Sequence, residues 1–153
     1  MPEFDAPKPV GGGSAETAQV GKMLGNLNPL DSKQMAHAEN QSSQLLESAK
    51  GGGFRVSENA AKPIRDALIE AYDDVLGILK EARVLAAEPQ LGTGPYAQQV
   101  ANHVRQSADG PQGILPVLEQ LKGILQKSEQ ALKIAMDNYR ETEAEQQSTF
   151  NGN

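Results

Sequence analysis

Residues 115–139 read LPVLEQLKGILQKSEQALKIAMDNY. Apolar or small side chains recur in this stretch at spacings that alternate between three and four residues, which indicates a helix with one apolar seam. Leu115, Ile124, Ala131 and Ile134 widen the seam, and Pro116 suits the opening turn. We therefore predict a long helix that frays in the polar tail from Gln146 onward. The seam consists of Leu118, Leu121, Leu125, Ser128, Leu132, Ala135 and Tyr139.

An earlier stretch carries a second seam of the same kind, which predicts a second long helix. This helix begins either at a Ser57 cap, with a kink at Pro63, or at Pro63 itself. It ends near Glu88, because Pro89 disfavours helical geometry in the residue before it. The seam consists of Ala61, Ile64, Leu68, Ala71, Val75, Ile78, Ala82 and Leu85.

The segment between the two long helices contains a proline and glycine loop over residues 88–95. A shorter helix follows, with Tyr96, Val100 and Val104 on one side, and residues 109–113 interrupt it. Two long helices joined in this way predict an all-α, elongated antiparallel hairpin. If the chain folds back at Gly110, the hairpin becomes a three- or four-helix bundle.

Both apolar stripes are wider than the seam between two helices can cover, so we expect a helical protein partner. The partner is either another copy of the chain or a different protein. The residues predicted to bind it are Leu68 and Val75 on the earlier long helix and Leu118, Leu121, Leu125 and Leu132 on the later one.

Residues 1–53 are polar and contain two glycine triplets, at positions 11–13 and 51–53. This composition predicts a largely disordered N-terminal extension, with a weak helix between Ser32 and Ala49 as its one element. We place the domain boundary at the second triplet. The predicted organisation is an extension over residues 1–53, a helical hairpin domain over 54–147 and a disordered tail over 148–153.

The composition also excludes several classes of function. A formal net charge of −6 argues against binding to nucleic acid, which requires clustered Lys and Arg. The chain has no Cys, and neither His37 nor His103 has a second ligand at a metal-binding spacing. No arrangement of residues suggests a catalytic triad or a phosphate loop. We therefore predict no enzymatic activity, no cofactor, no metal and no small-molecule substrate.

Three segments resemble one known family. Residues 54–61 read FRVSENAA, residues 89–95 read PQLGTGP and residues 139–143 read YRETE. Together they resemble the Pro-Glu (PE) proteins of actinobacterial type VII (ESX) secretion, which are helical hairpins. The resemblance covers about residues 54–145, and the Pro-Glu dipeptide of this chain stands apart from it, at Pro2-Glu3.

The resemblance implies a secreted substrate or a secretion-associated protein, located outside the cell or in the cell envelope. It implies an export signal at Tyr139 and Glu143, which match the family's Tyr-x-x-x-Asp/Glu pattern. It also implies a PPE-like helical partner, with a secretion chaperone as a further candidate. The N-terminus lacks the pattern of a cleaved secretory signal, so export needs another route. The alternative is a cytoplasmic structural or adaptor protein that self-assembles through coiled-coil packing.

Overall fold

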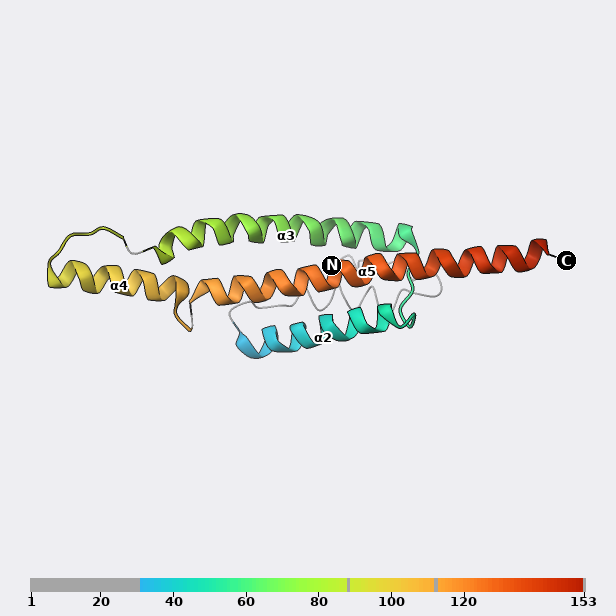
Figure 1. Cartoon of the computed structure of the whole chain (residues 1–153), viewed down its shortest axis with the longest axis horizontal. Helices are drawn as coiled ribbons and strands as arrows, with labels where there is room; N and C mark the ends of the chain where they lie inside the picture. Colours follow the sequence, from blue (N-terminus) through green and yellow to red (C-terminus); the bar gives the residue numbers. More distant parts are fainter. Residues whose placement is uncertain (1–30, 88, 112, 153) are drawn as a thin grey trace, which may run out of the picture.

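The computed structural model describes residues 31–87, 89–111 and 113–152. This part of the chain is all helical, which confirms the predicted fold class. The molecule is elongated, with α5 running along its middle and α2 and α3 on opposite sides of α5 (Figure 1). The helices are α2 (Ser32–Lys50), α3 (Glu58–Ala86), α4 (Pro95–Asp109) and α5 (Ile114–Asn151).

The predicted hairpin is formed by α3 and by α4 and α5 together. The chain leaves the end of α3, turns through the loop and returns along α4, which contacts both α3 and α5 (Figure 1). Pro95 lies in the first turn of α4, where its missing N–H costs no helical hydrogen bond. The two long helices therefore lie antiparallel, and the main core lies along α5, with side chains from α3 on one side and from α2 on the other.

The α3 seam is buried as predicted at Ala61, Leu68, Val75 and Ala82, but its register changes at one point. Leu79 is 2% exposed, whereas Ile78 is 46% exposed. Leu85, the last residue of the predicted seam, is 54% exposed. A spacing of three or of four residues after Val75 is equally helical, so only the packing against α5 selects Leu79.

Of the two predicted starts of α3, the structure has the one at Ser57. Ser57 is the N-cap, and its Oγ accepts a hydrogen bond from the Ala60 amide at 3.4 Å. Pro63 lies inside the helix, after its first turn. Phe54 and Val56, just before the cap, are fully buried, and the Val56 amide donates to the Ala135 carbonyl of α5 at 3.2 Å.

The N-terminal segment agrees with its prediction in having a helix that starts at Ser32, but this helix is packed into the fold and not part of a disordered extension. Residues 32–50 form α2, which begins at an Asp31 cap and packs along α5. Residues 31–53 therefore belong to the folded part of the chain, which corrects the prediction of a disordered extension over that range. Residues 1–30 lie outside the described residues. The face of α2 buried against α5 consists of Met35, Ala38, Ser42, Leu46 and Ala49.

The reason for the difference is the small size of the side chains at this interface. Ser42 on α2 and Ser128, Ala131 and Ala135 on α5 are all fully buried. Small residues allow two helices to approach closely, although they give little apolar signal in the sequence. Polar contacts add to the packing at the edge, where Lys127 Nζ donates to Ser43 Oγ at 3.0 Å.

The glycine triplet at 51–53 is a turn inside the domain and not a boundary. The Gly52 amide donates to the Ala49 carbonyl at 3.0 Å and the Gly53 amide to the Ser48 carbonyl at 2.9 Å. These bonds define a Schellman ending of α2, which requires the positive φ of 77° at Gly52. Asn138 of α5 then holds the turn, since its Nδ2 donates to the Ala49 carbonyl at 2.7 Å and to the Phe54 carbonyl at 3.1 Å.

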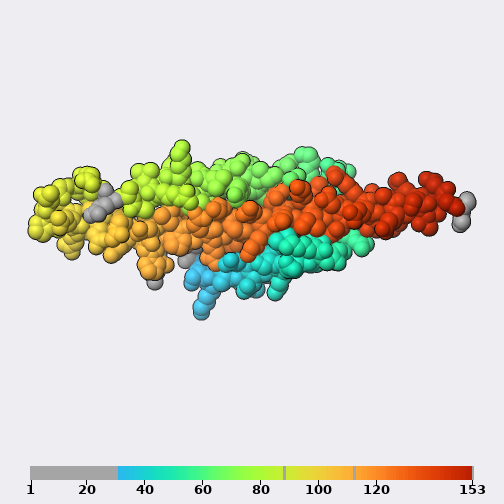
Figure 2. Space-filling model, viewed as in Figure 1, coloured from blue at the N-terminus to red at the C-terminus, as the bar shows by residue number. Residues whose placement is uncertain are grey.

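The last helix is longer than predicted. It continues to Asn151, so residues 148–151 extend it and are not a separate disordered tail. This part of α5 projects beyond the ends of α2 and α3, and its side chains lie open to solvent on the face seen in Figure 2. Residue 153 lies outside the described residues.

Candidate functional site

The six residues predicted to bind a partner lie in the intramolecular core. Leu132 is fully buried, Leu68 is 3% exposed, and Leu118, Leu125 and Val75 are at most 7% exposed. Leu121 is half-buried and packs against the same cluster. These side chains hold α3 against α5 and are covered within one molecule, which corrects their assignment to a partner-binding surface. A partner has to contact other residues.

Apolar side chains remain exposed along one edge of the α3/α5 seam. Ile69 is 39% exposed and Leu76 is 41% exposed, while Tyr72 lies half-buried between them. The residues are spaced by three and four, so they follow one line along α3. These residues are not part of the predicted seam. The apolar and aromatic residues at positions 69, 72 and 76 are the sequence signal that identifies this second line.

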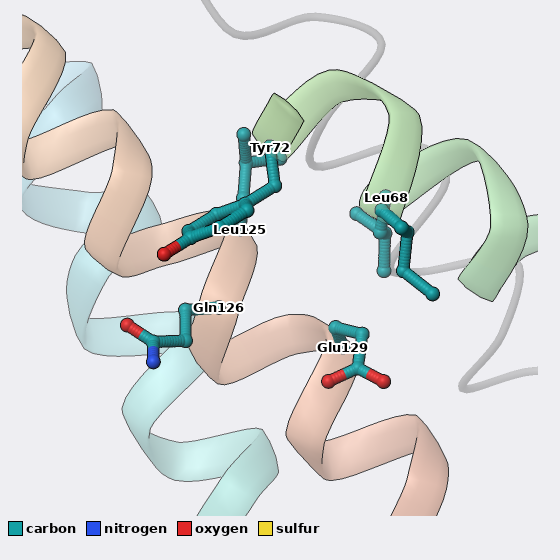
Figure 3. Close-up of a pocket in the computed structure, with 6 residues that line it drawn as sticks. Leu68, Tyr72, Leu125, Gln126 and Glu129 are labelled. Atoms are coloured by element: carbon teal, nitrogen blue, oxygen red, sulfur yellow. The ribbon is translucent and has the colours of Figure 1, made fainter. Parts of the chain in front are cut away.

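A groove of about 210 Å³ lies along this edge, where α3 meets α5, and we call it the α3/α5 groove. Figure 3 shows Leu68 and Tyr72 projecting from α3 and Leu125, Gln126 and Glu129 from α5. The two leucines form an apolar floor, and the amide and carboxylate provide a polar rim. The lining residues are Leu68, Ile69, Tyr72, Leu125, Gln126 and Glu129.

Two ion pairs cross from α3 to α5 on either side of this apolar line. Arg65 Nε donates to Glu129 Oε1 at 2.6 Å, before Ile69 in the sequence. Arg83 Nη2 donates to Glu119 Oε1 at 2.9 Å, after Leu76. Hydrogen bonds from Lys122 and from Arg83 lower the pKa of Glu119 below its ordinary value. The exposed apolar line on α3 thus has a charged pair before it and another after it, an arrangement that suits an amphipathic helix.

The two residues of the predicted export signal meet on one face of α5. The Glu143 carboxylate raises the pKa of the Tyr139 phenol through a hydrogen bond and through its charge. Tyr139 is half-buried and Glu143 is exposed. The pair lies within α5, before the helix ends at Asn151, and not past its end.

A shallow hollow of about 290 Å³ lies beside this pair, and we call it the C-terminal hollow. It includes the first turn of α3 as well as α5, because α3 begins opposite this part of α5 (Figure 1). Arg140 Nη2 donates to Glu58 Oε2 at 2.7 Å and links the two helices. The lining residues are Ser57, Glu58, Asn59, Tyr139, Arg140 and Glu143.

The described part of the chain offers little for other classes of site. In residues 31–87, 89–111 and 113–152, no three acidic or histidine side chains come together as metal ligands. Within the same ranges, no helix is long and apolar enough to cross a bilayer. His37 on α2 and His103 on α4 are both exposed.

Comparison with known proteins adds no relative. The chain matches no protein-family model, no curated protein and no solved structure. The features that bear on function are therefore the α3/α5 groove, the C-terminal hollow and the sequence segments that surround them.

Proposed function

We propose that this chain is a substrate or an associated protein of a type VII secretion system that binds a helical partner. The observation that carries the proposal is the position of Tyr139 and Glu143 four residues apart on α5, around one hollow and beside the Arg140–Glu58 ion pair that marks the start of α3. A phenol beside a carboxylate on an accessible helical face is a compact recognition element. Its position on a helical hairpin agrees with the Tyr-x-x-x-Asp/Glu export pattern that the sequence resembles.

The partner contacts the α3/α5 groove under this proposal. The exposed apolar surfaces of Ile69 and Leu76 are removed from water when a helix lies along them, which favours binding. A partner helix with apolar residues at spacings of three and four matches this line, since helices bind grooves through such anchors. A PPE-like protein is the partner implied by the sequence resemblance, with a second copy of the chain as the other candidate.

The test is export from an actinobacterial host that has a type VII system. Glu143→Ala removes one carboxylate from an exposed position, where substitutions usually change stability by less than about 0.5 kcal/mol. We expect this variant to accumulate in the cells while the parent chain appears in the medium. Glu145→Ala is the matched control, because it removes the same charge from an exposed position two residues further along α5.

Equal export of the Glu143→Ala variant and the parent contradicts the assigned signal. Retention of the parent chain in the cell contradicts secretion itself. In that case the cytoplasmic adaptor becomes the better proposal. The exposure of Ile78 and Leu85 on the other edge of α3 favours such self-assembly, and a concentration-dependent mass in light scattering is its signature.

A further inference from the structure

The C-terminal hollow brings together residues that are far apart in the sequence. Tyr139 and Glu143 lie on the side of α5 where α3 begins, so the hollow beside them also has walls from Ser57, Glu58 and Asn59. Any protein that covers both Tyr139 and Glu143 across this hollow therefore meets the first turn of α3. The surface around the pair is not formed by α5 alone.

Several contacts fix the first turn of α3 in this place. The Arg140–Glu58 ion pair joins the two helices at 2.7 Å, and the same arginine lies 3.8 Å from Asp137. Just before α3, the Val56 amide donates to the Ala135 carbonyl, and Asn138 Nδ2 donates to the Phe54 carbonyl. Since these bonds precede and follow the Ser57 cap, the turn is held at both ends against α5.

We propose that the recognition surface for export is composite, and that the first turn of α3 forms part of it together with Tyr139 and Glu143. The inference rests on the proposed export function and adds to it the residues Ser57, Glu58 and Asn59. A receptor then binds the folded hairpin and not a linear C-terminal segment. Unfolded chains lack the surface, because only folding brings residues 57–59 beside residues 139–143.

The charges of this region specify the chemistry of the receptor. Residues 137–145 contain four carboxylates and one guanidinium. That guanidinium is already bound to Glu58, which leaves Glu143 with the Tyr139 hydroxyl as its neighbour. A carboxylate beside an aromatic ring binds a cationic side chain through an ion pair and a cation–π contact. The complementary receptor surface is therefore basic, with a Lys or Arg directed at Glu143.

Substitution of Asn59 tests the composite surface. Asn59 is exposed at the rim of the hollow, in the first turn of α3. Asn59→Arg adds bulk and a positive charge against a basic receptor, so we expect export to fall at least about tenfold, the scale of one lost interface anchor. Gln99→Arg is the control, because it adds the same guanidinium at an exposed position on α4, far along the molecule.

Two further variants separate bulk from charge and guard against misfolding. Asn59→Tyr adds bulk without charge, and we expect it also to reduce export. Asn59→Asp adds a carboxylate with no added bulk, and we expect it to be exported at least as well as the parent. Circular dichroism and the melting temperature of each purified variant establish that only folded variants are compared.

The outcomes distinguish this inference from the proposed function. If Glu143→Ala is retained and folded Asn59→Arg and Asn59→Tyr are retained as well, the composite surface is supported. If Glu143→Ala is retained but both Asn59 variants are exported like the parent, the composite surface is overturned and the export signal stands. Loss of export with Asn59→Asp overturns the basic receptor. If Glu143→Ala is exported normally, the export signal fails and the composite surface fails with it.

Discussion

Asn138 is the residue whose replacement tests the fold most directly. One side-chain amide donates two hydrogen bonds, to the Ala49 carbonyl at 2.7 Å and to the Phe54 carbonyl at 3.1 Å. These carbonyls lie on either side of the Gly51–Gly53 turn, so Asn138 fastens the connection between α2 and α3 to α5. Asn138→Ala removes both bonds and adds no bulk.

The magnitude follows from the two bonds. A typical intramolecular hydrogen bond contributes about 0.5–1.5 kcal/mol net, so the pair contributes about 1–3 kcal/mol. The Ala49 carbonyl still accepts a hydrogen bond from the Gly52 amide, so removal of the Asn138 bond costs less free energy there. The Phe54 carbonyl belongs to a fully buried residue, so removal of its bond costs more. We expect a fall of about 2 kcal/mol in the free energy of unfolding, or roughly 5–10 °C in melting temperature.

The assay is urea denaturation followed by helical circular dichroism. Asn102→Ala is the matched control, because Asn102 is an exposed helical asparagine whose side chain accepts one bond from Arg105 on the surface of α4. Both substitutions replace Asn by Ala inside a helix, so they change helix propensity equally. The difference between their free energies of unfolding therefore reports the two hydrogen bonds from Asn138 to the turn. A difference below about 0.5 kcal/mol, within the range of ordinary surface substitutions, refutes the reasoning.

Further predictions concern the two helix interfaces and the groove. Ser128→Ala should raise the free energy of unfolding by about 1 kcal/mol in the same assay, because the buried Ser128 Oγ has no hydrogen-bond partner among the described residues; a destabilised variant contradicts this. Leu125→Asp should abolish the cooperative melting transition, since a charge buried at 5% exposure costs several kcal/mol; Leu91→Asp, at 52% exposure, should melt like the parent chain. Ile69→Asp should weaken co-purification of the helical partner while the melting temperature stays near that of the parent; unchanged partner recovery excludes the α3/α5 groove.

The sequence by itself determined the two long helices and the way they pair. In each seam, large aliphatic side chains recur every three or four residues. This spacing places them on one face only when the segment is helical. The positions of Leu68, Leu118, Leu125 and Leu132 on the two seams are therefore identifiable from the order of residues, whereas their burial within one molecule, and not against a partner, was decided by the packing. Pro89 and the glycines after it determined the reversal of the chain, because backbone restrictions act locally and are visible in the residues themselves.

Other features were decided by the tertiary structure, because each depends on a surface that another segment supplies. The α2 helix has a weakly apolar face, which becomes a stable interface only where α5 supplies apolar partners such as Ile124, which is buried with Met35 and Ala38. The choice of Leu79 over Ile78 depends on the rotation of α3 against α5. The placement of Asn59 and Glu143 around one hollow has no local signal, because it depends on long-range bonds such as that from the Val56 amide to the Ala135 carbonyl.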